Sequence, residues 1–274
     1  MDAKKKRTAG ERRKQLKEKE ENAKLLLVFG DFLVTGIWVC LSSTFGEAAE
    51  ALASISGLGE FALTVTVIVS AIMMMGPMCD MFGGAMFNPI HNAAFVCAGR
   101  GTLTLNVVRM VAQIGGALGG SYLAVTITPE WLKDRFHTLP GGLKPGVALG
   151  VGVGVEMLLG MVLNMVVLYA SDAQRSKFVA YWSPVFATVL LIVTGSYFTG
   201  PSMNPAVAFS WYHHYQGHSW LEQIAVYWLA PFAGAMLGGL LYRLLLKPAE
   251  AAAVKPARRL PPGLKAAAAG AKEE

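Results

Sequence analysis

The chain has 274 residues, of which 54% are hydrophobic and 15% are charged, with a formal net charge of +6. Soluble globular domains carry about 25% charged residues, so this composition excludes an ordinary soluble domain. The basic residues gather near the two ends of the chain: ten of the 24 Lys and Arg precede Leu25, and seven lie at or after Arg243. The middle of the chain is therefore an apolar block, which predicts a membrane protein.

Six apolar segments are long enough to cross a bilayer, which takes about 20 residues of helix. In chain order they are Lys24–Phe45, Leu58–Met75, Thr104–Ile127, Gly146–Ala170, Phe178–Thr194 and Glu222–Leu246. Backbone polar groups inside a bilayer must be satisfied within the segment, so each is predicted to be a helix. The predicted fold class is an all-α membrane protein with six transmembrane helices.

The two ends of the chain differ from this block. Residues 1–23 mix both signs of charge and are expected to extend the first helix as a solvated tail that attracts anionic lipid. The first span is long enough to act as an uncleaved anchor, so no cleaved signal peptide is expected. Residues 247–274 are rich in Ala, Pro and Lys and predict a disordered basic tail. The distribution of Lys and Arg predicts that both termini are cytoplasmic.

Two similar units occupy the apolar block. Asn88-Pro89 and Asn204-Pro205 lie 116 positions apart, and the first helix of each unit carries a carboxylate, Asp31 or Glu156. A Gly-x-x-x-Gly pair in the third helix recurs 119 positions later, from Gly115 to Gly234. The predicted organisation is an N-tail, a first repeat, a connecting loop, a second repeat and a C-tail, at residues 1–23, 24–127, 128–145, 146–246 and 247–274.

Each repeat has three spans, so the second must insert upside down, and such inverted repeats place their site near the midplane. Asn is a strong N-cap and Pro is favoured at the first helical position, so each Asn-Pro pair predicts a helix start. The apolar runs that follow, Ile90–Cys97 and Ala206–Tyr212, are too short to span and predict re-entrant half-helices. Two helix N-termini that meet at the centre disfavour cations, while the asparagines donate hydrogen bonds. The predicted pore-lining residues are Asn88, Pro89, Ile90, Asn204, Pro205 and Ala206.

The paired boxes resemble those of the aquaporin, or major intrinsic protein, family. Gln113 before Gly115-Gly116-Ala117 and the run Val226-Tyr227-Trp228 resemble the third- and sixth-helix patterns of that family. Gly30-Asp31 and the altered third residue of the first box, Ile90, are similar to the small basic intrinsic proteins of plants. The resemblance implies a passive channel for water or small neutral solutes, a homotetramer and no cofactor. It also implies the endoplasmic reticulum membrane, with the plasma membrane as the alternative.

The constriction positions depart from the family pattern. Val207 stands where most members have Arg, and Ile192 where water-selective members have His. Pro201 lies three residues before Asn204, and the fourth position falls near Ile68. The expected constriction is therefore apolar and without a fixed cation, so the resemblance leaves the solute open.

Three buried titratable groups have two interpretations each. His91, the repeat counterpart of Val207, is a candidate pH-sensitive gate or a packed histidine bonded to a loop carbonyl. Asp31 and Glu156 are expected to be structural carboxylates that accept hydrogen bonds from the re-entrant loop of their own repeat. The alternative for the two carboxylates is a proton relay.

Other chemistry is not expected. The cluster of His213, His214 and His218 lacks a Cys or a carboxylate pair at ligand spacing, so no metal site is predicted. A nucleic-acid partner does not fit a six-span protein in the lipid bilayer. No catalytic constellation reaches the midplane, so the chain is not expected to be an enzyme. The sequence thus predicts a passive channel, with an ion- or proton-coupled transporter and a closed membrane scaffold as alternatives.

Overall fold

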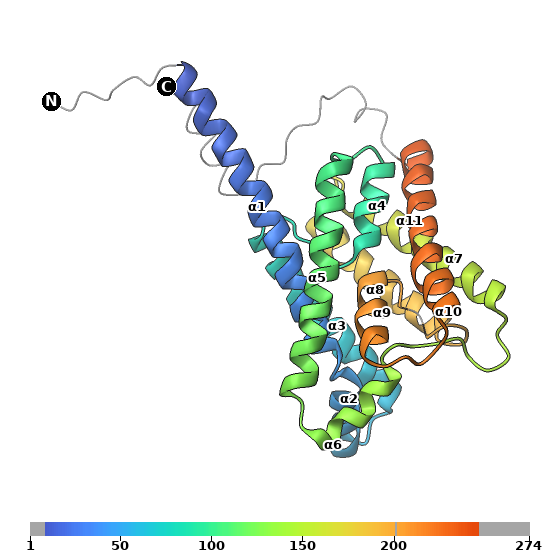
Figure 1. Cartoon of the computed structure of the whole chain (residues 1–274). Coiled ribbons are helices and arrows are strands. Elements are labelled where there is room, and N and C mark those ends of the chain that lie inside the picture. The colour runs from blue at the N-terminus through green and yellow to red at the C-terminus, as the bar shows by residue number, and fades with distance from the viewer. Residues whose placement is uncertain (1–8, 201, 247–274) are drawn as a thin grey trace.

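The computed structural model describes residues 9–200 and 202–246, and over these residues it contains helices and no strands (Figure 1). Six helical segments are long and apolar enough to cross a membrane. Five of them are single helices: α1 (Ala9–Ser42), α3 (Glu60–Met81), α5 (Leu103–Ile127), α7 (Leu149–Ala170) and α8 (Lys177–Gly195). The sixth runs without a break through α10 (Trp220–Ile224), η2 (Ala225–Leu229), α11 (Ala230–Leu241) and η3 (Tyr242–Leu246). The predicted all-α fold with six spans is confirmed.

Two short helices begin at the Asn-Pro pairs: α4 (Pro89–Cys97) and α9 (Pro205–His214). Each packs against the third helix of the opposite repeat, α4 on α11 and α9 on α5. A Cβ added at Gly239 of α11 would lie 2.4 Å from the carbonyl oxygen of Ala94, so glycine is what lets α4 approach this closely. Each half-helix therefore packs on a helix of the repeat to which it does not belong.

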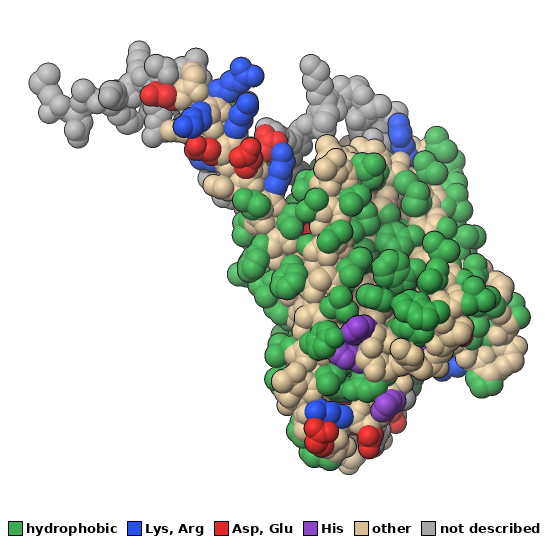
Figure 2. Space-filling model, in the orientation of Figure 1, with side chains coloured by type: hydrophobic (Ala, Val, Ile, Leu, Met, Phe, Trp, Pro, Cys, Tyr) green, Lys and Arg blue, Asp and Glu red, His purple; other side chains and the backbone are tan. Residues whose placement is uncertain are grey.

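The first span is longer than predicted, because the charged leader continues the helix. α1 has 34 residues and a length of about 51 Å at 1.5 Å per residue, against about 30 Å of hydrocarbon. Its first part projects beyond the other helices, and charged side chains gather there, whereas hydrophobic side chains cover the middle of the molecule (Figures 1 and 2). Lys24 and Glu20 form an i,i+4 ion pair of 3.2 Å at the boundary. The predicted solvated extension of the first helix is present from Ala9 onward.

Two connections predicted as loops contain helices. α2 (Phe45–Ser56) fills the connection after the first span, and α6 (Glu130–Lys133) with η1 (Asp134–Thr138) lies between the repeats. Both lie at the end of the molecule opposite to the start of α1 (Figure 1). They are too short to span, so the six-span topology is unchanged.

The second span also ends later than predicted, at Met81 instead of Met75. Pro77 has no N–H and cannot bond the carbonyl of Met73 four residues earlier. The hydroxyl of Tyr181, from α8, donates to that carbonyl instead, and its ring fills the space above Gly76. A hydrogen bond from another helix thus allows α3 to continue beyond Pro77.

The first and third helices of each repeat cross at glycines. A Cβ on Gly116 would lie 2.0 Å from the carbonyl oxygen of Phe32, and one on Gly234 would lie 1.9 Å from that of Met157. By contrast, a Cβ on Gly115 would meet only a ring edge at 3.6 Å. The third helices therefore correspond at an offset of 118, from Gly116 to Gly234, and the predicted offset of 119 is wrong by one residue.

Candidate functional site

The two half-helices begin with the same cap. The side-chain oxygen of Asn88 accepts a hydrogen bond from the Ile90 N–H at 3.2 Å. That of Asn204 accepts from the N–H groups of Ala206 at 3.2 Å and Val207 at 3.4 Å. The residue after each asparagine is proline, whose missing N–H leaves no donor unpaired at the first helical position. Local chemistry therefore places both helix starts.

The other end of each asparagine amide crosses to the opposite repeat. The Asn88 side-chain N–H group donates to the carbonyl of Met203 at 2.7 Å, and that of Asn204 donates to the carbonyl of Phe87 at 2.8 Å. Each asparagine thus binds the residue that immediately precedes the other. The two helix N-termini, each with a partial charge of about +0.5, are held face to face.

The backbone at Met203 is adapted to this contact. Its φ angle is 45°, the only positive φ among the described non-glycine residues. This conformation is unfavourable for a residue with a side chain. It presents the Met203 carbonyl to Asn88 while the N–H of the same residue donates to Glu156 at 3.2 Å. The loop before the second half-helix is thus bound on both sides.

The two carboxylates bind the loops that precede the half-helices. One oxygen of Asp31 accepts from the Met86 N–H at 2.6 Å. Glu156 accepts from the Thr199 hydroxyl at 2.7 Å as well as from Met203. Both side chains are fully buried. Each carboxylate therefore accepts hydrogen bonds from the loop of its own repeat. Within the described residues, no series of titratable groups connects Asp31 to Glu156.

Sequence reasoning missed Arg109, the partner of Asp31. From α5 its guanidinium donates to both oxygens of Asp31, with one contact at 2.9 Å, and to the Gly84 carbonyl at 3.0 Å. The signal was available, because Arg109 is the only charged residue in α5 and an arginine inside a span needs a partner. In the second repeat Tyr227, 118 positions later, donates to the Thr199 carbonyl at 2.7 Å. At corresponding positions, the loop before α4 is thus bound by an arginine and the loop before α9 by a tyrosine.

A series of amides ties α4 to α5. The Gln113 amide donates to Asn92 at 2.9 Å, and Asn92 donates to Asn106 at 3.0 Å. Asn106 in turn donates to the backbone carbonyl of Thr102 at 2.8 Å. In the second repeat the counterpart of Asn92 is Ala208, so this series belongs to the first half-helix alone.

His91 lies on the third residue of α4 and contacts α7. Its Nδ1 is 2.8 Å from the side-chain oxygen of Asn164, whose N–H group donates to the Gly160 carbonyl at 2.8 Å. The predicted alternative, a bond to a loop carbonyl, is therefore wrong in its partner. The role of the ring as a gate stays a prediction.

The four predicted constriction residues lie in different surroundings. Ile192 is partly buried against a cluster that contains Met203, and Val207 packs on one that contains Ala206. Ile68 is partly buried on α3 and belongs to neither cluster. Pro201 lies outside the described residues. Their convergence on one constriction stays a prediction.

The remaining polar clusters bind within the chain. His213 contacts the Tyr122 hydroxyl at 2.8 Å, His214 contacts Ser121 at 3.1 Å and His218 contacts Gln223 at 2.7 Å. In the described part of the chain no group of three His, Cys, Asp or Glu side chains is arranged to hold a metal ion. The three cysteines there form no disulfide.

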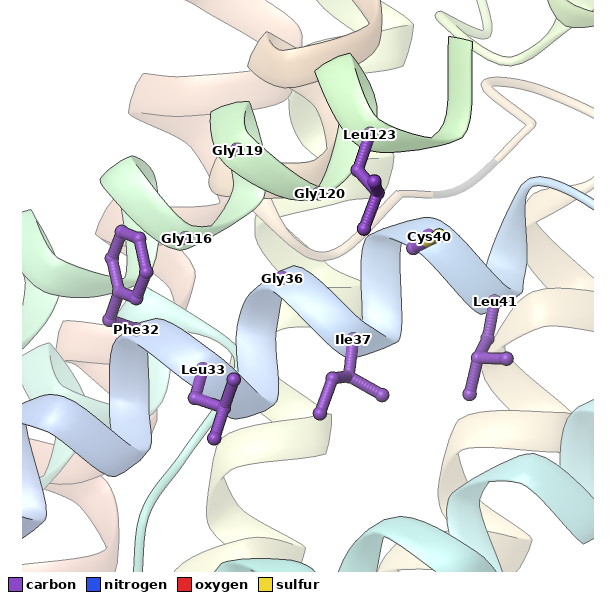
Figure 3. Close-up of a pocket in the computed structure, with 10 residues that line it drawn as sticks. All are labelled: Phe32, Leu33, Gly36, Ile37, Cys40, Leu41, Gly116, Gly119, Gly120 and Leu123. Atoms are coloured by element: carbon purple, nitrogen blue, oxygen red, sulfur yellow. The ribbon is translucent and has the colours of Figure 1, made fainter. Parts of the chain in front are cut away.

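A groove of about 390 Å³ lies along the α1–α5 crossing, and neither Asn88 nor Asn204 is among its lining residues (Figure 3). Its walls are apolar, and Leu123 and Leu41 at its rim are 52% and 41% exposed. Gly116 and Gly120 form its floor. In a membrane, such a surface faces lipid tails or another protein and does not conduct a polar solute.

Comparison with known proteins agrees with this geometry. The sequence model of the major intrinsic protein family matches residues 19–242. The chain belongs to the major intrinsic protein family. It is therefore a multi-pass membrane channel of the aquaporin family and not an enzyme.

Curated relatives place this aquaporin-family chain beside the small basic intrinsic proteins of plants. Aquaporin SIP1-1 of Oryza sativa subsp. japonica is 37% identical over 229 residues, which cover 80% of this chain and 92% of the relative. The probable aquaporin SIP1-2 of Arabidopsis thaliana is 33% identical over 226 residues, covering 79% and 91%. The predicted subfamily resemblance is confirmed.

A solved structure confirms the aquaporin fold. The X-ray structure of the aquaglyceroporin from Plasmodium falciparum matches with a TM-score of 0.67 at 20% identity, over 82% of this chain and 98% of that one. At this identity the likeness establishes the arrangement of helices and not the solute.

Proposed function

We propose that this chain conducts water, and through the same path other small neutral solutes, passively between Asn88 and Asn204. The observation that carries the proposal is the reciprocal pair of bonds from each asparagine to the loop of the other repeat, at 2.7 and 2.8 Å. Each side-chain NH₂ group has two N–H donors, and the cross-bond uses one of them. The second donor of each is left to orient a passing solute.

The two half-helix ends supply the barrier to ions. Their partial positive charges face the same region, which favours the oxygen of a neutral solute and disfavours a cation. In the proposed outer constriction Ile68, Ile192 and Val207 present hydrocarbon and no charge, and Pro201 is assigned there from sequence alone. Exclusion of protons and cations therefore rests on the helix ends.

The proposed setting is an intracellular membrane with both termini in the cytoplasm. The concentration of Lys and Arg in the two end segments supports this orientation. The likeness to small basic intrinsic proteins supports the endoplasmic reticulum and a homotetramer with one pore per subunit. The plasma membrane is the alternative location.

The two rival functions make different demands on the site. A proton-coupled transporter needs a carboxylate that exchanges its proton during transport, whereas Asp31 is already neutralised by Arg109 and bound to a loop N–H. A closed scaffold needs no open path past the asparagines. A scaffold predicts no osmotic response, whereas a coupled transporter predicts flux that depends on an ion or proton gradient.

Osmotic swelling and shrinking of proteoliposomes test the proposal. Purified full-length protein should make vesicles shrink faster than empty vesicles after a sucrose step, with a low activation energy. Glycerol or peroxide uptake without water flux would change the assigned solute. No flux for any solute would indicate a scaffold, and dependence on an imposed proton gradient would indicate a transporter.

Substitution of Val207 tests the outer constriction. Val207→Arg places a long cationic side chain in the proposed outer constriction and narrows it. Uptake of glycerol should therefore fall more than uptake of water. Val207→Leu, which changes shape without charge, is the matched control. Greater glycerol uptake in the arginine variant would contradict this placement of Val207.

A further inference from the structure

The position of His91 relative to the asparagine pair is fixed by helix geometry. His91 lies three residues after the N-cap Asn88, and residues three apart share one face of a helix. Val207 has the same relation to Asn204. Because the two half-helices start from opposite sides of the same contact, His91 lies on the same path as Val207 but in the other half of the channel. Its side chain is only partly buried.

The proton arrangement on the imidazole follows from its partner. The Asn164 amide donates its N–H to the Gly160 carbonyl, so its oxygen is the atom that faces His91. An amide oxygen only accepts, so Nδ1 of His91 carries the hydrogen in the neutral ring. The other nitrogen, Nε2, is then a bare acceptor. Nε2 has no hydrogen-bond partner in the described part of the chain, and it is not fully buried there. Part of its surface is therefore accessible to solvent.

No charged group among the described residues acts on this ring. On α5 Arg109 is paired with Asp31, and on α7 Glu156 is bonded to Thr199. The remaining charged or titratable groups on elements packed against α4 lie in the last turns of those elements or beyond them: Tyr122 on α5, Tyr169 on α7, Tyr212, His213 and His214 on α9, and Tyr242 and Arg243 after α11. Asn164 alone determines the orientation of the imidazole.

From these contacts we infer that His91 is the residue that determines specificity in the inner half of the channel, with Asn164 as its positioning residue. This inference rests on the proposed channel function. Nε2 accepts a hydrogen bond from a solute that carries an O–H or N–H group. The proposed outer constriction offers no polar side chain, so the main polar discrimination takes place at His91 and not at the outer positions.

The same geometry predicts how the passage of water at His91 responds to acid. Because Nδ1 already carries a hydrogen, a second proton can enter the ring only at Nε2. The Nδ1 proton is held by an amide oxygen, which is not a base, so the ring does not pass a proton onward. Acid instead converts the acceptor into a fixed cation in the path. Water flux should therefore fall with pH without a rise in proton flux.

Proteoliposomes buffered equally on both sides at pH 7.5 or 5.5 test the inference. Wild-type water permeability should be lower at pH 5.5 than at pH 7.5. His91→Val should conduct about fivefold less than wild type at pH 7.5, the rate equivalent of one hydrogen bond of about 1 kcal/mol, and should show no further fall in acid. His91→Gln, which keeps a polar amide but does not titrate, should retain most of the flux and lose the acid response.

Two further variants separate the role of the ring from its fold. Asn164→Asp replaces the amide by a carboxylate that stabilises the imidazolium, so the acid response should begin at higher pH; a purely structural Asn164 would not move this midpoint. His137→Val, the same change at an exposed ring of η1, is the matched control and should behave as wild type. Wild-type flux and acid response in both His91 variants would overturn the inference and leave the channel intact. A wild-type protein without flux would overturn the proposed function and the inference together.

Discussion

At the scale of single residues, the asparagines perform two tasks that their sequence position does not separate. Their oxygens cap their own helices, and their N–H groups bind the opposite loop. Capping is local chemistry, and the Asn-Pro pairs were sufficient to predict it. The cross-bond joins residues 115 positions apart, so it required the tertiary structure. The same limit applies to Arg109, whose partner Asp31 lies 78 positions away.

The Arg109–Asp31 pair makes a stability prediction. Arg109→Met leaves a fully buried carboxylate without its cation, which should lower the stability of the protein by about 3–5 kcal/mol. Asp31→Asn combined with Arg109→Met removes both charges and should recover most of that loss. Thermal unfolding in detergent measures both. A single variant as stable as wild type would show that the ion pair contributes little.

At the scale of elements, the pattern of apolar residues predicted the six spans, but neither the helices in two connections nor where every span ends. α3 continues past Pro77 because Tyr181, 108 positions from Met73, bonds the Met73 carbonyl that proline leaves free. The glycine register failed for a related reason. Gly115-Gly116 and Gly119-Gly120 are adjacent pairs, and a sequence cannot say which member of each pair faces the neighbouring helix. The close contacts of Gly116 with the Phe32 backbone and of Gly120 with the Gly36 backbone distinguish them.

The glycine register can be tested with two neighbouring substitutions. Gly116→Ala places a Cβ 2.0 Å from a backbone oxygen of α1, so α1 and α5 must separate, which should destabilise the protein by about 1–3 kcal/mol. Gly115→Ala meets only a ring edge at 3.6 Å and should be neutral or slightly stabilising. Thermal unfolding of the pair decides the register. Equal loss in both variants would contradict the crossing described for α1 and α5.

At the scale of the whole molecule, six spans among the described residues predict that the start of α1 and the end of η3 lie on the same side of the membrane. The described residues end at Leu246, close to the end of the last span. In sealed microsomes, short epitope tags added before residue 1 and after residue 274 should both be digested by external protease, while a tag inserted in the 128–145 connection should be protected. Protection of one terminal tag would contradict an even number of spans.

The packing of each half-helix on the opposite repeat has a consequence for the synthesis of the chain. α4 belongs to the first repeat, yet it packs most extensively on α11, which is part of the last span to be synthesised. Asn88 likewise binds a carbonyl of a loop made more than a hundred residues later. Until then the short helix of the first half has only its own repeat, chiefly α5, to pack on. In the proposed channel, the passage between the two asparagines forms only once the second repeat is in place, so an incomplete chain should have no such passage.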